Sequence, residues 1–239
     1  VKLQIELNQL QLDSFAFQRY QQLYGSNNYG VDNEKSRRKS YINTDEFRMI
    51  FLRCELFDAT KAARRLINFV ELMYELYGDI GIQRRILLED MSDGEKKILQ
   101  AGYTQILPSR DRAGRRILIH IAYNSTNEHT VNSRLRIVLY LYQQWFVDDI
   151  ETQRKGANSI LWYHNVNIFQ DLSTRMKSYS ALSKVSPIRM GAIHICIPDT
   201  DGNSSTATSA NVINSMVALS LGAKWVSRLR IHTGSAMEC

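Results

Sequence analysis

The sequence has few of the residues that mark disulfide-bonded or disordered proteins. Its 239 residues include three cysteines, three prolines and twelve glycines. Cys54, Cys196 and Cys239 are too few and too scattered for a disulfide framework, so free thiols in the cytoplasm are expected. The scarcity of proline and glycine argues against long disordered stretches, apart from short polar loops.

Long apolar runs are also absent. No run reaches the roughly 18 to 20 residues that a membrane-spanning helix needs. The first residues, Val1-Lys2-Leu3-Gln4, lack the charged and then apolar pattern of a signal peptide. They also lack an initiator Met, which is compatible with a fragment of a longer protein.

The chain carries an excess of positive charge, with a formal net charge of +6 at pH 7. That excess favours an anionic partner, either a membrane surface or a nucleic acid. Nucleic-acid binding would place aromatic side chains among clustered basic residues. Here aromatic residues such as Tyr140, Trp145 and Phe146 recur at helical spacing, which is typical of a core. No nucleic-acid partner is therefore predicted.

The first part of the chain has helical spacing of apolar residues. A helix from about residue 3 to 24 is predicted, although the alternation of Leu3, Ile5 and Leu7 also allows a short strand. Residues 25–43 are polar and predict a linker, whose basic run we interpret as solvated surface.

Further helix starts are predicted between residues 44 and 95. Thr44 or Asp45 caps the first helix, Asp58 caps the second, and Ser92 with Glu95 forms a capping box at the third. Apolar residues three and four apart form one face of the second helix, which Gly78 ends; they are Ala62, Ala63, Leu66, Phe69, Val70, Met73 and Leu76.

From residue 103 strands alternate with helices, which predicts an α/β sheet with helices packed on it. Residues 103–107 and 115–121 are expected to form a hairpin around a turn at 110–114. A long helix is predicted over 131–154, with Leu135, Leu139, Tyr142 and Phe146 on one face and Gly156 at its end. The remaining elements are a strand at 157–163, a helix at 171–183, a strand at 188–197, a polar loop at 199–206, a helix at 207–220 and a short strand at 228–232.

No sequence motif for catalysis is present. The chain has no phosphate-binding glycine loop of either common type and no Gly-x-Ser-x-Gly elbow. Asp148, Asp149 and Glu151 are interpreted as the solvated end of the long helix, because acid–base catalysis needs carboxylates in a cleft.

A zinc site is conceivable if His120, His194 and Cys196 approach one another, since residues two apart on a strand share a face. No close Cys/His pairs support it, so these are expected to be ordinary strand residues. Neither a metal nor a cofactor is predicted.

Three stretches together carry a family resemblance. Residues 51–58, Phe-Leu-Arg-Cys-Glu-Leu-Phe-Asp, followed by Lys61-Ala62-Ala63, resemble the signature of the helical N-terminal part of CRAL-TRIO lipid-binding proteins. Residues 101–115 are similar to the first hairpin of the family, and 151–156, Glu-Thr-Gln-Arg-Lys-Gly, to its Glu-Thr-Gln-x-x-Gly. Residues 186–195 and 228–232 follow in family order, and the branch most similar is that of α-tocopherol-transfer and retinaldehyde-binding proteins.

The resemblance implies a helical N-terminal region followed by a mixed β-sheet flanked by helices, with a lid helix over an apolar pocket. It implies pocket residues on the sheet floor and the long helix, namely Leu139, Gln143, Ala157, Ser159, Leu161, Ile193, Ile195 and Ile197. The lid would use Val212, Met216 and Leu219. Arg189, Arg228 and Arg230 would bind phosphate groups at a membrane surface. Periodicity alone favours a solid core at the apolar positions.

The sequence departs from the family at several basic positions. Ala192 replaces a lysine found in phosphatidylinositol-transferring relatives, and Gly191 replaces the second basic residue of the tocopherol branch. Glu55 replaces the second arginine of the N-terminal signature. Only about half of the basic residues expected to bind membrane phosphoinositides at the mouth of the pocket are therefore present. The loop at 199–206 is expanded, and the Leu-Pro-x-x-Tyr-Gly-Gly ending of the family is missing.

These observations divide the chain into an N-terminal helix with a polar linker at 1–43, a helical region at 44–90 and an α/β lipid-binding domain at 91–239. We expect a cytoplasmic, peripherally membrane-associated monomer that is not an enzyme. It would bind one lipophilic molecule, such as a tocopherol, a retinoid or a phospholipid, and transfer it between membranes through transient contact with an anionic surface. The alternative is a protein- or membrane-docking module with a vestigial pocket.

Overall fold

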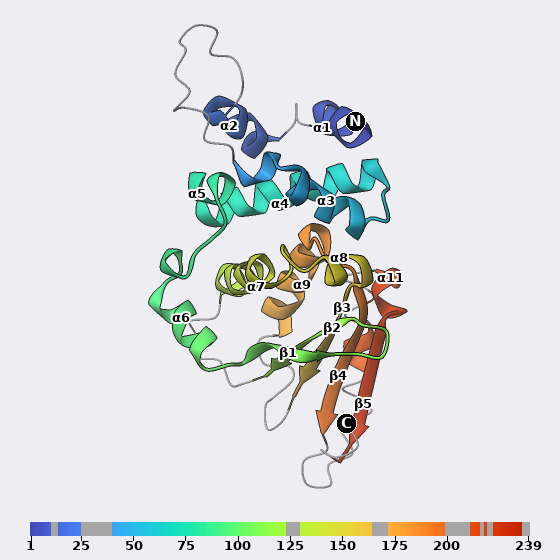
Figure 1. Ribbon diagram of the computed structural model, residues 1–239. Coiled ribbons are helices and arrows are strands. Elements are labelled where there is room, and N and C mark those ends of the chain that lie inside the picture. The colour runs from blue at the N-terminus through green and yellow to red at the C-terminus, as the bar shows by residue number, and fades with distance from the viewer. Residues whose placement is uncertain are drawn as a thin grey trace, which may run out of the picture.

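The computed structural model describes residues 1–10, 14–24, 40–122, 130–163, 172–198, 211–215, 218 and 222–235. Helices form one half of the molecule and a twisted sheet forms the other, as Figure 1 shows. The α/β class predicted from the alternation of strands and helices is confirmed. The regularity of that alternation after residue 103 explains why the sequence was sufficient for this prediction.

The N-terminal half is built of helices α1 (Lys2–Leu10), α2 (Phe15–Tyr24), α3 (Asp45–Cys54), α4 (Ala59–Tyr77) and α5 (Asp79–Gln83), with short 3-10 turns at Tyr41–Asn43 and Leu88–Asp90. The single helix predicted over 3–24 is wrong, because two helices occupy this range. The Ser14 hydroxyl accepts a hydrogen bond of 3.1 Å from the Phe17 backbone N–H and so starts α2. The alternative strand at Leu3–Leu7 is wrong as well.

The linker predicted over residues 25–43 is too long at its C-terminal end. Residues 25–39 lie outside the described residues, but Ser40 is buried and begins a 3-10 turn. Its hydroxyl donates a hydrogen bond of 2.6 Å to the Ile82 carbonyl in α5. The polar sequence around Ser40 gave no sign of this contact, because a serine that caps a turn cannot be distinguished from a loop serine in sequence.

The predicted caps are confirmed. The Thr44 side chain accepts a hydrogen bond from the Phe47 backbone, and Asp58 accepts one from Lys61. Ser92 and Glu95 form the capping box that opens α6 (Asp93–Gln100). Gly78 ends α4 with a φ of 60°, a backbone conformation that favours glycine.

The sheet has five strands in the order β1-β2-β3-β4-β5. They are β1 (Thr104–Arg110), β2 (Arg116–Ile121), β3 (Ala157–Trp162), β4 (Met190–Pro198) and β5 (Leu229–Gly234). The pair β1 and β2 is the predicted antiparallel hairpin, whereas β2, β3, β4 and β5 run parallel. The parallel strands are connected through helices α7 (Val131–Trp145), α8 (Ile150–Lys155) and α9 (Leu172–Val185), and α11 (Ala223–Val226) precedes β5.

The long helix predicted over 131–154 is wrong, since α7 ends at Trp145 and α8 begins at Ile150. Asp149 divides them, because its carboxylate accepts a hydrogen bond of 3.0 Å from the Thr152 backbone and caps α8. The same carboxylate lies 2.7 Å from Arg110 and 3.0 Å from Arg116. The interpretation of Asp149 as a solvated helix end is therefore also wrong.

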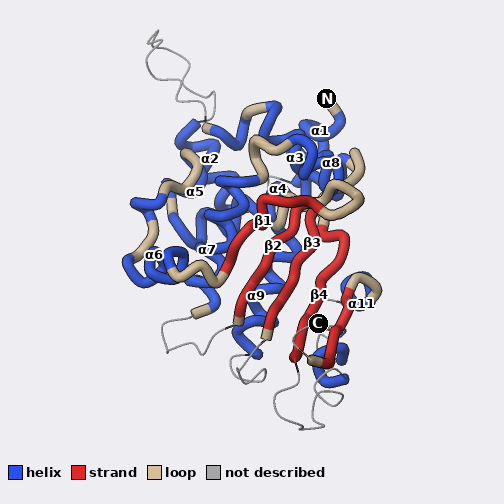
Figure 2. The backbone as a smooth tube through the Cα atoms, turned by 60° about the horizontal axis from the view of Figure 1, so that its bottom comes forward, coloured by secondary structure: helices blue, strands red, loops and turns tan. Residues whose placement is uncertain are grey.

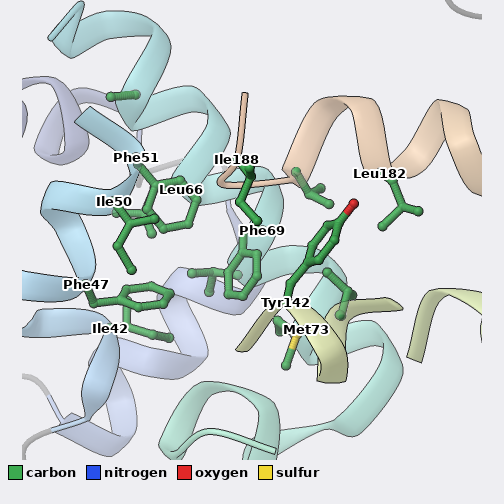
Figure 3. Packing of buried hydrophobic residues seen from close by; sticks show 14 of the residues in the cluster. Ile42, Phe47, Ile50, Phe51, Leu66, Phe69, Met73, Tyr142, Leu182 and Ile188 are labelled. Atoms are coloured by element: carbon green, nitrogen blue, oxygen red, sulfur yellow. The ribbon is translucent and has the colours of Figure 1, made fainter. Parts of the chain in front are cut away.

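The main core joins the helical half to the sheet half. The rings of Phe47, Phe51 and Phe69 pack in edge-to-face or tilted contacts, with centroids 5.3 to 5.6 Å apart. Figure 3 shows these rings together. The predicted stripe of α4, from Ala62 to Leu76, is buried in this cluster. The cluster continues through Tyr142 and Leu182 to Ala157 and Met190 on the sheet. The N-terminal helices therefore support the elements that position the site.

Candidate functional site

An apolar cavity of ≈ 90 Å³ lies between the sheet and the helices that cover it. Figure 2 shows α9 behind the central strands. Two rows of paired residues form its floor, because side chains in register on neighbouring strands share a face. One row pairs Ser159 with Ile193 and Leu229, and the other pairs His120 with Leu161 and Ile195. The floor is thus apolar apart from Ser159 and His120.

Helices α7 and α9 and the segment at α11 make the walls. They contribute Val138 and Tyr142 from α7, Met176, Tyr179 and Leu182 from α9, and Trp225 from α11. The α9 residues recur at a spacing of three, and this was the sequence signal that could have identified them. Sequence reasoning missed them because a stripe on a helix also fits a solid core.

The structure brings part of the predicted pocket set together. Ser159, Leu161, Ile193 and Ile195 line the cavity. Leu139 and Ala157 are fully buried in the main core instead. Ile197 lies in a second apolar cluster with Ile213.

Gln143 has a structural partner outside the cavity. Its Oε1 accepts a hydrogen bond of 2.8 Å from the backbone N–H of Ile86, and its Nε2 lies 3.9 Å from the Met73 sulfur. Gln143 thereby satisfies a buried backbone donor between α5 and α6.

The predicted lid is described only in part. Residues 211–215 are helical, and Val212 is partly buried there. Its neighbour Ile213 packs with Leu161, Ile195 and Ile197 on the face of the sheet that carries the cavity. Met216, Leu219 and the loop at 199–206 lie outside the described residues.

A second cavity of ≈ 80 Å³ adjoins the first and is lined by charged and polar side chains as well as apolar ones such as Ile98, Ile121 and Ile137. Both cavities are lined by His120, Val138, Tyr179 and Leu182. The second one adds two arginines, Arg134 and Arg175, together with Tyr103, Thr104 and Ser178. Burial lowers the pKa of His120 to about 4, and the positive charges of Arg175 and Arg134 act in the same direction. The site therefore has an apolar floor and a basic end.

The three predicted phosphate-binding arginines contact backbone carbonyls. Arg189 donates to the Arg154 carbonyl, and Arg228 donates a hydrogen bond of 2.9 Å to that of Met190. Arg230 donates to the carbonyls of Ser227 and Leu229. In the described part of the chain none of the three has a carboxylate partner within 4.0 Å, so they do not form the ordinary salt bridges that were the alternative. All three lie at the end of the sheet where β4 and β5 begin.

Gly191, which replaces a basic residue of the family, has no room for a side chain. A Cβ there would lie 2.6 Å from Asn158 Oδ1 and 3.1 Å from Nε of Arg115. Asn158 Oδ1 is already occupied, because it accepts a hydrogen bond of 2.9 Å from the Ala192 backbone. A guanidinium group therefore lies beside this position although the sequence has glycine there. Sequence reasoning missed Arg115 because it lies in the turn before β2, far from Gly191 in the sequence.

The zinc arrangement considered from the sequence does not form. His120 faces the cavity, in register with Leu161, whereas His194 lies one residue out of that register and faces the other side of the sheet. His194 instead stacks on His232, with Nδ1 and Nε2 2.9 Å apart. Among the described residues no group of three or more potential ligands could hold a metal ion.

Two larger hollows, of ≈ 540 Å³ and ≈ 520 Å³, open on the surface around α6. The first is lined by side chains of both charges, including Glu75, Glu95 and Arg136. The second includes Lys96, Tyr140 and Trp145. Both are more open than the cavity at the sheet and have more polar linings, so the cavity at the sheet is the better candidate for a ligand that avoids water. In the described part of the chain no helix is long and apolar enough to cross a membrane.

Comparison with solved structures shows a likeness in fold. No protein-family model matches the sequence. The structure is similar to the crystal structure of Sfh5, a Sec14-like CRAL-TRIO protein, with a TM-score of 0.51 and 11% sequence identity. The match covers 96% of this chain and 80% of that chain. At this identity the likeness establishes the architecture alone: the chain has a Sec14-like fold, a mixed sheet flanked by helices.

Proposed function

We propose that the protein binds a small lipophilic molecule between the sheet and α9 and transfers it between membranes. The apolar cavity over Ser159, Leu161, Ile193 and Ile195 carries this proposal. Burial of each ligand CH₂ group in such a site stabilises the complex by about 0.8 kcal/mol. Apolar burial alone can therefore bind an acyl or isoprenoid chain, without any charged contact. The Sec14-like fold adds support, because it is shared with a CRAL-TRIO protein.

The cavity must enlarge when a ligand enters. Its volume of ≈ 90 Å³ is well below the roughly 300 to 1,000 Å³ of typical ligand sites. The floor is fixed by strand pairing, so the wall is the part that moves. The 211–215 helix, which packs on the cavity face through Ile213, is the wall element that we assign to opening.

Membrane contact is the second part of the proposal. Arg189, Arg228 and Arg115 lie near the first residues of β4, where Met190 also lines the cavity. Guanidinium groups suit lipid phosphates because they donate paired hydrogen bonds. Opening against an anionic bilayer would let the ligand leave without crossing water.

The experiment is native mass spectrometry of the purified protein, followed by titration with fluorescent sterol, tocopherol, retinoid and phospholipid probes. We expect a co-purified lipid or saturable binding of at least one probe class. A protein without bound lipid that also fails to bind every class would contradict the proposal.

The alternative, a docking module with a vestigial pocket, is favoured by one observation. The small volume is what a cavity filled by its own side chains would leave. The two functions differ in their response to ligand. A ligand-binding protein unfolds at a higher temperature when a lipid saturates it, whereas a vestigial pocket gives no such shift.

A further inference from the structure

We propose that the turn between α3 and α4 docks on an anionic lipid bilayer, with Leu56 and Phe57 inserted at the boundary between headgroups and acyl chains. These two residues are called the docking tip below. The inference rests on the membrane contact of the proposed function and deepens it, because it names the segment that enters the bilayer. The tip belongs to the motif at residues 51–58, and neither of its residues lines the cavity.

Both side chains of the docking tip lie largely in solvent. Leu56 is 70% exposed and Phe57 is 66% exposed. Apart from Val1 at the N-terminus, no large apolar side chain in the described residues is more exposed than Leu56. The tip therefore contributes little to the core. Adjacent apolar side chains that remain in water are typical of a surface that binds a partner or a membrane.

The backbone of the docking tip has a conformation that glycine adopts most easily. The φ angle is 55° at Leu56 and 65° at Phe57. The Phe57 N–H donates a hydrogen bond of 2.7 Å to the Leu52 carbonyl, and the Leu56 N–H donates one of 3.3 Å to the Arg53 carbonyl. This is the Schellman arrangement, in which glycine is usual at the position of Leu56 because a Cβ is unfavourable at positive φ. Neither burial nor backbone geometry thus explains two bulky apolar residues here, and strain of this kind is found at functional sites.

The acidic neighbours of the docking tip are already paired. Glu55, directly before the tip, forms a salt bridge with Arg65. Asp58, directly after it, caps α4 and lies 2.7 Å from the Lys61 ammonium group. Lys61 nevertheless keeps 70% of its side chain exposed. The two acids therefore add no net negative charge that would repel an anionic surface.

Two further exposed cations lie on the elements beside the docking tip. Lys184 is in the last turn of α9, next to Ser183, whose carbonyl accepts a hydrogen bond from Arg65. Arg154 is in α8, which packs against α3. In the described part of the chain neither cation forms a salt bridge. Lipid phosphates complement this charge, and Ser183 lines the apolar cavity, so a bilayer at the tip would meet this end of the cavity wall.

Another pair of exposed leucines has the opposite surroundings. Leu87 and Leu88 are 48% and 45% exposed. The nearby Arg84 is neutralised by Asp90, and Glu89 adds an exposed negative charge. An anionic bilayer would repel this pair. It is therefore a matched control that has the same kind of side chains but the wrong charge around them.

The first test is co-sedimentation with vesicles of equal parts phosphatidylcholine and phosphatidylserine. Leu56→Asn with Phe57→Asn keeps the turn, because asparagine tolerates positive φ. We expect this tip variant to bind about tenfold more weakly or worse, since burial of one large apolar side chain is worth about a factor of ten. Leu87→Asn with Leu88→Asn should bind as the wild type does. Undiminished binding by the tip variant, or an equal loss in both variants, would overturn the inference.

The second test separates insertion from charge. At about 1 M salt the Debye length is about 3 Å, so attraction between protein and lipid charges is largely screened. The wild type should keep part of its vesicle binding there, and the tip variant should lose it. Lys184→Gln with Arg154→Gln should lose binding mainly at low salt. Wild-type binding that vanishes at high salt would show that no apolar side chain inserts, and would overturn the inference.

Two further measurements on the tip variant keep this inference apart from a role in folding and from ligand binding. Its thermal unfolding temperature should equal or exceed that of the wild type, because the substitution relieves backbone strain. A lower unfolding temperature with unchanged vesicle binding would show that the side chains serve the fold, and would overturn the inference. Fluorescent lipid probes should bind the variant normally, and unchanged vesicle binding alongside normal probe binding would overturn the docking tip and leave the ligand site standing. If no probe binds the wild type but vesicle binding still depends on the tip, the proposed ligand is contradicted and the docking tip is supported.

Discussion

The Arg65 side chain on α4 donates a hydrogen bond of 2.9 Å to the backbone carbonyl of Ser183 on α9. The same nitrogen reaches the Ser186 carbonyl at 3.0 Å, and the guanidinium is paired with Glu55. Ser183 and Ser186 line the apolar cavity. The N-terminal helices are therefore attached directly to the C-terminal end of the cavity wall.

Replacing Arg65 should weaken both the fold and the wall. Arg65→Met removes the charged donor of the Ser183 and Ser186 carbonyls and of the largely buried Glu55 carboxylate, and leaves Ser186 only the weak contact from the Cys54 thiol. Since hydrogen bonds to charged groups contribute about 1.5 to 3 kcal/mol each, we expect a loss of about 2 to 3 kcal/mol in urea unfolding. The neighbouring exposed Arg64→Met is the control and should change stability by less than about 0.5 kcal/mol. Similar values for both variants would show that the contact to α9 is not stabilising.

Filling the cavity should block the ligand. Leu161 is 5% exposed and in register with His120 and Ile195 on the floor. We expect Leu161→Trp to occupy the cavity and reduce lipid affinity about tenfold or more, at a stability cost of about 1 to 3 kcal/mol. The control is Ile160→Trp, one residue earlier on the opposite face of β3. Lipid titration of both folded variants gives the answer, and unchanged affinity in Leu161→Trp would remove this cavity from the binding site.

The basic groups beside Met190 should contribute to membrane binding. Each basic residue near an anionic bilayer is worth about 1 kcal/mol, so Arg189→Ala with Arg228→Ala should lower liposome binding about tenfold or more. Co-sedimentation with phosphatidylserine vesicles measures this, and added salt should reduce binding by the wild-type protein. Arg64→Ala with Arg112→Ala removes the same net charge elsewhere. If both double variants lose binding equally, the effect is one of net charge and not of this site.

Asp149 should make the fold sensitive to acid. Burial raises its pKa, but hydrogen bonds from Thr152 and Arg116 and the charge of Arg110 outweigh it and lower the value to about 2. A carboxyl group with a lowered native pKa stabilises the fold above its unfolded pKa of about 4 and loses that contribution as the pH falls towards about 2. We expect Asp149→Asn to cost about 2 kcal/mol near neutral pH. Urea unfolding across this range should show a smaller acid-induced loss in the variant.

His120 should give a second pH dependence at higher pH. Its native pKa of about 4 lies below the unfolded value of about 6.5, so the unfolded state binds more protons in between. Stability should therefore fall as the pH is lowered from about 6.5 to about 4, by roughly 2 kcal/mol between pH 7 and pH 5. His120→Gln should remove this slope. A slope that is identical in the variant would assign the effect to other groups, such as His194, whose pKa is also lowered by burial and by His232.

Most secondary-structure elements were determined by the sequence, because their signals are local. The caps at Thr44, Asp58 and Ser92 and the apolar stripe of α4 depend on residues within one or two helical turns. The hairpin of β1 and β2 likewise follows from two strands around a turn. The two wrong helices share one cause: Ser14 and Asp149 interrupt an apolar pattern whose period continues across the break.

The candidate site was decided by the tertiary structure. The sequence could name Ser159, Leu161, Ile193 and Ile195 as one face of two strands, but only strand register brings them over one cavity with His120. It could not separate α9 residues that line a cavity from residues that fill a core, because both have the same helical period. Arg134 and Arg175 line the same cavity because the helices that carry them follow the parallel strands β2 and β3. No local sequence pattern encodes this long-range pairing.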